Sequence, residues 1–159
     1  MVLETPNLEL VLESLADVRA RIAAMPPDVR AQVSDEWLAK LDAADEPDPW
    51  QHGFAMFRRE DGQRVGECGV TGPPNSEGIV EIAYYVHEAW RSRGYATEAA
   101  AALTEHALGQ GVRIVRAHTL AELNASTRVL HRCGFRHLGE VIHPEDGRVW
   151  RWERMAPEA

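Results

Sequence analysis

The sequence predicts an α+β fold, with a mixed and mostly antiparallel sheet of about seven strands flanked by helices. Short strand-like runs come in pairs joined by turn residues, which predicts hairpins and antiparallel neighbours. Apolar residues also recur at helical spacing in several stretches. Because the predicted strands include hairpins, the sheet is not a doubly wound parallel one. With 159 residues and a hydrophobic fraction of 45%, the chain suits a single domain spanning residues 1–159.

The first third of the chain predicts one strand and two helical stretches. Residues 8–12 form the strand. Apolar residues at helical spacing follow it, and Pro26 and Pro27 end that first helix. A second apolar stripe runs from Val29 to Leu41, and Ser34 is expected to cap a restart inside it.

Six further strands and two helices are predicted in the rest of the chain. Turns at 60–62 and at Pro144-Glu145-Asp146-Gly147 join two pairs of these strands into hairpins. A long helix is expected from Gly94 to Gly109, and a shorter one from Asn124 to Cys133. The strands are expected at residues 53–57, 64–70, 79–86, 112–119, 135–142 and 149–155.

The formal net charge of −8 restricts the classes of partner. Nonspecific binding to nucleic acid requires clustered Lys and Arg that neutralise phosphates, so we expect no nucleic-acid partner. A cationic substrate is compatible with the acidic surface. The same charge would also arise simply from the need for solubility.

Membrane, secretion and metal signals are all missing from the sequence. No apolar run approaches the roughly 20 residues that span a bilayer, and the start of the chain lacks the pattern of a secretion signal. The two cysteines, Cys68 and Cys133, form no CxxC motif, and no HExxH motif occurs. We therefore expect a cytoplasmic protein with no membrane segment, no disulfide framework and no metal.

The most informative segment leads from the strand at 79–86, through a short loop, into the helix that starts near Gly94. The first N–H groups of a helix have no internal partner and carry partial positive charge, so they can bind a phosphate. Gly94 and Ala96 leave space for an anion close to the backbone. Arg91 and Arg93 can add ionic contacts to phosphate groups.

Two other phosphate-binding loops can be compared with this segment. A Walker A loop requires GxxxxGK[ST], which the sequence does not contain. The run Gly109-Gln110-Gly111 lacks the third glycine of a dinucleotide fingerprint, and it follows a helix where the fingerprint follows a strand. A dinucleotide-binding protein is therefore disfavoured.

The run Arg91-Ser92-Arg93-Gly94-Tyr95-Ala96 matches the (Q/R)xxGx(G/A) pyrophosphate loop of GNAT acetyltransferases. The chain resembles this superfamily over about residues 64–142, including Cys133-Gly134-Phe135 at the end of a helix. Its Asn-Ala-Ser run at 124–126 is most similar to the branch that contains the RimJ and RimL ribosomal-protein N-terminal acetyltransferases. The resemblance implies a GNAT-like sheet and acetyl-CoA as the co-substrate.

The resemblance also implies which residues bind the cofactor. The strand before the loop would splay from its neighbour and pair its backbone with the pantetheine arm, while the N–H groups of residues 93–97 would hold the pyrophosphate. Asn124 would touch the pantetheine, cap the following helix, or do both. The implied cofactor-binding residues are Tyr85, Val86, His87, Arg91, Arg93, Gly94, Tyr95, Ala96, Thr97, Asn124 and Ser126.

Transfer to an amine requires a base or a water chain, because the pKa is about 10.4 for a lysine amine and about 8 for an α-amine. Several GNAT enzymes place a catalytic glutamate early on this strand, which makes Glu81 the candidate here. Strand alternation puts Glu81 on one face with Ala83 and Tyr85. A solvated glutamate would fit the sequence as well. His118 is the second candidate, with a structural histidine as its alternative.

The leaving thiolate needs little acid assistance, because by analogy with cysteine its conjugate acid has a pKa of about 8 to 9. Many family members carry a tyrosine on the helix after the asparagine, but residues 124–133 contain none. Ser126 is the nearest hydroxyl and is predicted to donate to the sulfur, with support of the helix start or a phenol from Tyr85 as alternatives. An N–H near Val86 would stabilise the thioester oxygen. Cys133 is interpreted as a buried structural thiol.

These features predict an enzyme that acetylates a primary amine by direct attack in a ternary complex. The acceptor could be a protein N-terminus or a small-molecule amine, and an exposed sheet edge could support a homodimer. The alternative from a different class is a noncatalytic acyl-CoA-binding regulatory module that has kept the cofactor site.

Overall fold

The computed structural model describes residues 1–144 and 146–157 of the chain. Its strands are β1 (Val2–Glu4), β2 (Leu8–Leu12), β3 (Phe54–Arg58), β4 (Arg64–Thr71), β5 (Ile79–Val86), β6 (Ile114–Leu120), β7 (Arg136–His143) and β8 (Gly147–Met155). They form one eight-stranded sheet in the order β1-β2-β3-β4-β5-β6-β8-β7. Among the strand pairs of the described residues, only β5–β6 is parallel, so the predicted α+β class with a mostly antiparallel sheet is confirmed.

The strand that the sequence did not predict is β1, and it raises the number from about seven to eight. β1 has only three residues, and it pairs with β2 at the edge of the sheet. At the other end of the chain, β7 and β8 form the expected hairpin. Glu145 of the predicted turn between them lies outside the described residues.

The helices are α1 (Leu15–Ala23), α2 (Pro27–Arg30), α3 (Asp35–Ala43), α4 (Tyr95–Gly109) and α5 (Ala125–Arg132), with a 3₁₀ turn at Glu88–Trp90. The predicted restart is confirmed, because the Ser34 side chain accepts a hydrogen bond from the Trp37 N–H at the start of α3. Within the described residues, no helix is long and apolar enough to cross a membrane.

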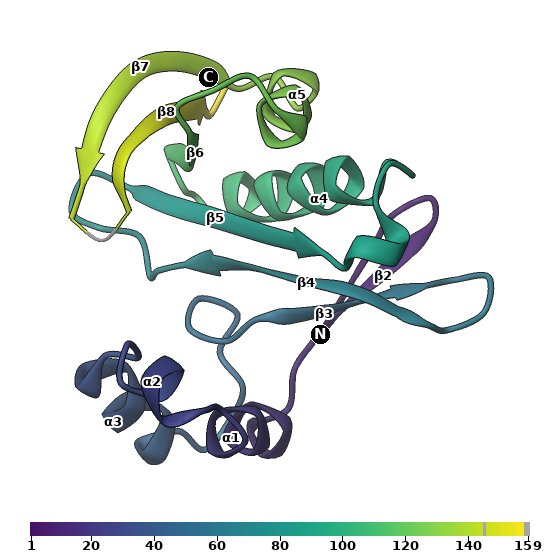
Figure 1. The fold of residues 1–159 in the computed structure, drawn as a ribbon, viewed down its shortest axis with the longest axis vertical. Coiled ribbons are helices and arrows are strands. Elements are labelled where there is room, and N and C mark those ends of the chain that lie inside the picture. The colour runs from purple at the N-terminus through teal and green to yellow at the C-terminus, as the bar shows by residue number, and fades with distance from the viewer. Residues whose placement is uncertain (145, 158–159) are drawn as a thin grey trace.

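The helices lie in two groups on opposite sides of the sheet. Figure 1 shows α4 and α5 on one side and α1, α2 and α3 together on the other. α4 lies against the sheet through small and aliphatic side chains, of which Ala99, Ala100, Leu103 and Ala107 are fully buried. α1 and α3 share a smaller apolar cluster around Val18, Ile22 and Leu41. One face of the sheet is therefore covered by α4 and α5, and the other face has α1, α2 and α3 on its side.

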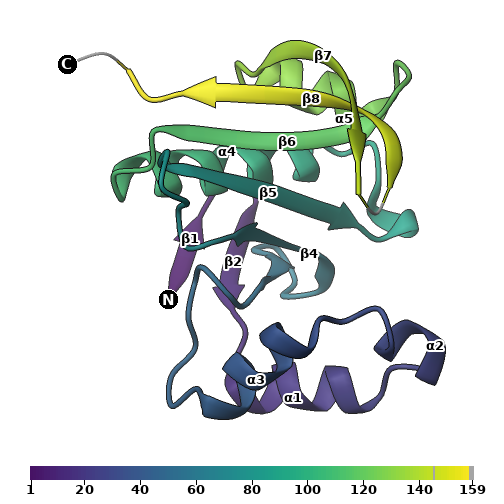
Figure 2. The ribbon, with the colours of Figure 1, turned by 90° about the vertical axis from the view of Figure 1, so that its left-hand side faces the viewer.

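The sheet opens between β5 and β6. These two strands pair only over residues 79–81 and 114–116, whereas β5 continues along β4 as far as Val86. Beyond Glu81 the two strands diverge, as Figure 2 shows. The opening leaves one edge of β5 without a strand beside it, in the place where the resemblance put the pantetheine arm.

Candidate active site

A groove of about 540 Å³ lies beside the free part of β5. Its walls come from the end of β5, the loop before α4, the first turn of α4 and one face of α5. The lining residues are Tyr84, Tyr85, Val86, Trp90, Arg91, Ser92, Gly94, Tyr95, Ala96, Thr97, Ala125, Ser126, Arg128, Val129 and Arg132. Most of the predicted cofactor residues therefore meet in one place.

The first turn of α4 presents its backbone N–H groups at this groove. Gly94 is the N-cap and offers no side chain to these groups. The N–H groups of Tyr95, Ala96 and Thr97 precede the first internal bond, which Glu98 makes to the Gly94 carbonyl. Gly94 has a φ of 85°, which glycine adopts readily, and a Cβ there would meet no protein atom within 4 Å. The residue thus shapes the turn and leaves the space above it open.

The acidic residue of this first turn points elsewhere. Glu98 accepts hydrogen bonds from the Thr5 hydroxyl at 2.6 Å and from the Asn7 N–H and side-chain amide at 2.8 Å each. Burial raises the pKa of Glu98, but these hydrogen bonds outweigh that effect, and the pKa is lowered overall. Glu98 is therefore held ionised against the β1–β2 turn, and it does not line the groove.

The charge of the groove is opposite to that of the protein. Among the described residues, Arg91, Arg128 and Arg132 line it and no Asp or Glu does, although the whole chain carries a net charge of −8. A helix N-terminus surrounded by arginines fits the phosphates of coenzyme A. The residues present therefore fit the cofactor that the resemblance implies.

The two loop arginines have different positions. Arg91 donates from Nε to the Val86 carbonyl at 2.9 Å, and its guanidinium lies 5.3 Å from the centre of the Tyr85 ring. Arg91 thus ties the loop to the end of β5 while it lines the groove. The Arg93 guanidinium lies over the Trp90 ring at 5.1 Å, and Arg93 is not one of the lining residues.

The backbone of β5 alternates between β4 and the opening. His87 donates its N–H to the Val65 carbonyl, so by antiparallel alternation the backbone groups of Tyr85 also face β4. Those of Tyr84 and Val86 then face the opening. The imidazole of His87 bonds to Glu67 at 2.9 Å, and this side chain does not line the groove.

The start of α5 borders the groove from the other side of the opening. The Asn124 side chain accepts from the Thr127 N–H at 3.0 Å and forms a capping box with Thr127, so its predicted role as a helix cap is confirmed. Asn124 itself does not line the groove, whereas Ser126, two residues further on, does.

Tyr84 and Ser126 face each other across the opening. Their hydroxyl oxygens are 2.9 Å apart, and the Tyr84 hydroxyl is also 3.4 Å from the Ser126 carbonyl oxygen. Burial raises the pKa of Tyr84 to about 12, so the phenol stays protonated at neutral pH. Tyr84 is therefore the tyrosine in contact with Ser126, whereas the phenol donor that was predicted from the sequence as an alternative is Tyr85.

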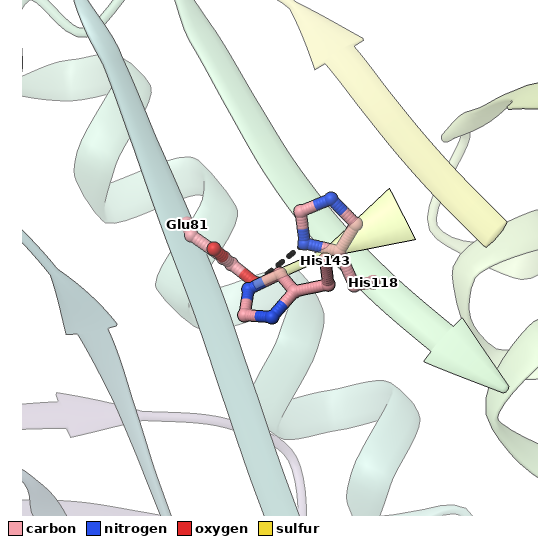
Figure 3. A group of neighbouring side chains, drawn as sticks. All are labelled: Glu81, His118 and His143. Atoms are coloured by element: carbon pink, nitrogen blue, oxygen red, sulfur yellow. Dashed lines mark hydrogen bonds and ion pairs between the residues drawn. The ribbon is translucent and has the colours of Figure 1, made fainter. Parts of the chain in front are cut away.

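The two candidate bases are bonded to each other near the narrow end of the opening. His118 Nδ1 lies 2.8 Å from Glu81 Oε1, and Arg151 donates from Nε to His118 Nε2 at 3.1 Å. Figure 3 shows His143 beside them, with its ring centre 5.3 Å from that of His118. Glu81 alternates with the core residues Val80 and Ile82, so it faces the side opposite α4.

The comparison with family models decides the identity of the fold. A model described as an acetyltransferase (GNAT) domain matches residues 4–136. The chain belongs to the GNAT acetyltransferase family. It is therefore a GNAT-type N-acetyltransferase, as the pyrophosphate loop had predicted, and acetyltransfer is the reaction class to which its site geometry must be related.

Solved structures show the same GNAT fold at low sequence identity. RimL, named as a ribosomal L7/L12 alpha-N-protein acetyltransferase in complex with coenzyme A, has a TM-score of 0.71 at 15% identity, with 98% of each chain covered. A GNAT-family acetyltransferase from Bacillus anthracis has a TM-score of 0.69 at 18% identity, with 99% of this chain and 100% of the other covered. A GNAT-family acetyltransferase from Bordetella pertussis has a TM-score of 0.65 at 24% identity, covering 97% and 99%. No curated protein sequence matches significantly.

Several residues of the groove were not predicted from the sequence, among them Tyr84, Arg128 and Arg132. The two arginines carried a readable signal, because residues 125, 128, 129 and 132 follow helical i, i+3, i+4, i+7 spacing and all line the groove. Tyr84 carried no local signal, since its partner lies 42 residues away.

Cys133 is a buried free thiol, in agreement with its structural interpretation. Its sulfur lies 3.6 Å from the Thr97 carbonyl oxygen, and burial raises the pKa of the thiol. A raised pKa lowers the thiolate fraction, which is unfavourable for a nucleophile.

Proposed function

We propose that this GNAT enzyme transfers the acetyl group of acetyl-CoA to a primary amine, on a protein N-terminus or a small molecule, by direct attack in a ternary complex. The observation that carries the proposal is the groove at the α4 N-terminus, next to the open edge of β5 and lined, within the part of the chain that the structure describes, by three arginines and no carboxylate. This arrangement combines a site that suits phosphate groups with strand backbone that is not paired with a neighbouring strand.

The residues that would hold acetyl-CoA divide between its two ends. The N–H groups at the start of α4, together with Arg91, Arg128 and Arg132, suit the phosphates. The backbone groups of Tyr84 and the N–H of Val86 suit an extended amide-containing arm, in the manner of an added strand, while the Val86 carbonyl already accepts from Arg91. The cofactor supplies the acetyl group as a thioester.

The acceptor amine would approach from the face opposite α4. A second hollow of about 340 Å³ lies on that side, and its walls include Glu13, Trp37, His52, Glu67 and Tyr85. Glu81 shares this face by strand alternation. Glu81 would accept the proton of the attacking amine directly or through water, and the N–H of Val86 would stabilise the negative charge on the thioester oxygen.

RimL, as its name states, is an alpha-N-protein acetyltransferase of ribosomal L7/L12. That likeness supports a protein N-terminus as one acceptor class to test here. Small amines form the other class.

Thermal unfolding with acetyl-CoA, CoA and NAD tests the proposal first. A ligand at about 100 times its Kd stabilises the native state by about 2.7 kcal/mol, which gives a readily visible rise in Tm. A rise with acetyl-CoA and CoA but not with NAD supports the proposal, and no rise with acetyl-CoA overturns it. A panel of peptides and small amines, followed by detection of released thiol, then tests transfer. Binding without thiol release from any amine would favour the noncatalytic module.

A further inference from the structure

We propose that Tyr84 is a positioning residue that orients the Ser126 hydroxyl toward the sulfur of coenzyme A. The inference rests on the proposed function, because it assumes that the groove between β5 and α5 holds the cofactor. The inference assigns a role to Tyr84 on β5, a residue to which the family resemblance gave none.

Both hydroxyls belong to residues that line the groove, and the family resemblance implies the pantetheine end of the cofactor at Ser126. Tyr84 comes from β5 and Ser126 from the first turn of α5, and both line the groove. Their contact therefore joins β5 to α5 across the groove. The pyrophosphate end is fixed separately by Gly94 and its neighbours on α4.

Either hydroxyl can donate in the 2.9 Å contact, and the arrangement that we propose is the one in which Tyr84 donates to Ser126. The phenol can donate to Ser126 Oγ at 2.9 Å or to the Ser126 carbonyl at 3.4 Å. The shorter contact is the better hydrogen bond. When Tyr84 donates to Oγ, the Ser126 hydrogen is left to point into the groove, and the serine becomes a stronger donor because hydrogen bonds in a chain polarise one another.

The acidities disfavour a proton transfer from Tyr84 through Ser126 to the sulfur. A thiol resembling cysteine has a pKa of about 8.5, whereas that of Tyr84 is about 12. Moving the phenol proton to a thiolate would thus be unfavourable by more than three orders of magnitude. In the proposed step the C–N bond forms, the C–S bond breaks and sulfur leaves as a thiolate. The amine proton passes to Glu81 or to water, and Tyr84 and Ser126 keep their protons and donate hydrogen bonds.

The pKa of the bound CoA thiol tests the inference without knowledge of the acceptor. It is measured from the ultraviolet absorbance of the thiolate during a pH titration of the saturated complex. In the unmodified protein we expect a pKa about one to two units below that of free CoA, the tenfold to hundredfold effect of a hydrogen bond to a charged group. Tyr84→Phe should lose much of this shift and Ser126→Ala most of it. The double variant should resemble Ser126→Ala, because Tyr84 acts through the serine.

Thr104→Val is the matched control for the loss of a buried hydroxyl. Thr104 is fully buried in α4, donates to the Ala100 carbonyl at 2.7 Å and does not line the groove. It should lower stability while leaving the thiol pKa unchanged. A Tyr84→Phe complex with the same thiol pKa as the unmodified protein would overturn the inference.

Ser126→Ala keeps the inference testable if Tyr84→Phe fails to fold. An unchanged thiol pKa in Ser126→Ala would overturn the inference equally. If calorimetry showed that the unmodified protein binds no CoA, the proposed function itself would fail, and the inference with it. The two failures are therefore distinguishable.

Discussion

His118 donates a hydrogen bond from Nδ1 to the carboxylate of Glu81, because Arg151 already donates to the other ring nitrogen. An arginine Nε–H cannot accept, so His118 Nε2 must present its lone pair and Nδ1 must carry the proton. The side chain of Glu81 is 37% exposed and that of His118 only 9%. The two candidate bases are thus unequal: Glu81 faces solvent and His118 supports it from behind.

We expect Glu81→Gln to lower kcat/KM by about a hundredfold or more, since general base catalysis contributes at least that much. The loss should be largest at low pH, where the amine is hardest to deprotonate. The measurement is the pH–rate profile with an acceptor found in the amine panel. An unaltered profile would remove Glu81 as the base.

His118→Asn and His118→Leu separate a donor from a base at position 118. Asparagine can keep an N–H near the place of Nδ1, whereas leucine keeps none. If His118 only holds Glu81, we expect Asn to retain most of the rate and Leu to lose about tenfold, the effect of one hydrogen bond to a charged group. Equal and severe loss in both variants would instead make His118 the base.

Arg128 and Arg132 should contribute to cofactor affinity through the phosphates. Because both are exposed, we expect each change to Gln to raise the Kd for CoA only about three- to tenfold, and to weaken its dependence on salt. Isothermal calorimetry at two salt concentrations measures both effects. Arg30→Gln, which removes the same charge from the exposed end of α2, is the matched control and should leave the Kd unchanged. A similar loss in that variant would mean that net charge alone sets affinity.

Gly66 should be essential for the position of β5. A Cβ at Gly66 would overlap the carbonyl oxygen of Tyr85 on the neighbouring strand, so one backbone would have to shift. We expect Gly66→Ala to lower the free energy of unfolding by about 1–3 kcal/mol, the usual cost of overpacking, and to weaken CoA binding. Gly69→Ala lies on the same strand, and its Cβ would be 3.5 Å from the Gly53 Cα, an ordinary contact. Thermal unfolding and calorimetry should show a much smaller change in that control.

Glu98 should make stability depend on pH. Its pKa is lowered in the folded protein from the ordinary value of 4.5, so its stabilisation is fully present above that value and is lost as the pH falls through the folded pKa. We expect Glu98→Gln to cost about 1 kcal/mol at neutral pH, with the difference shrinking in acid below the folded pKa. The measurement is the Tm of the unmodified protein and of Glu98→Gln, at neutral pH and at a pH below the folded pKa of Glu98. Glu122→Gln, at an exposed position after β6, should show no such pH-dependent difference.

The parts of the fold that local patterns determine could be predicted from the sequence. The caps at Ser34 and Asn124 and the glycine at 94 depend on a few neighbouring residues, and each lies where the sequence placed it. β1 could not be predicted, because a three-residue run becomes a strand only through its pairing with β2.

In the site, too, only the features that depend on neighbouring residues in the sequence could be predicted. The phosphate loop is contiguous in sequence, so its chemistry could be read directly. The Tyr84–Ser126 and Glu81–His118 contacts join segments 42 and 37 residues apart. Strand alternation could place Tyr84 and Glu81 on opposite faces, but no sequence pattern shows which helix or strand lies against each face.

The short seam between β5 and β6 has a mechanical consequence. Since only three residue pairs of the described strands join β5 to β6, the sheet has two parts that are connected at one end. One part contains β1 to β5, the other contains β6, β8 and β7, and α4 packs against the sheet. A molecule bound in the opening would contact both parts of the sheet and restrict their motion relative to each other. Amide hydrogen exchange should then slow on both sides when CoA is added, including at residues that never touch it.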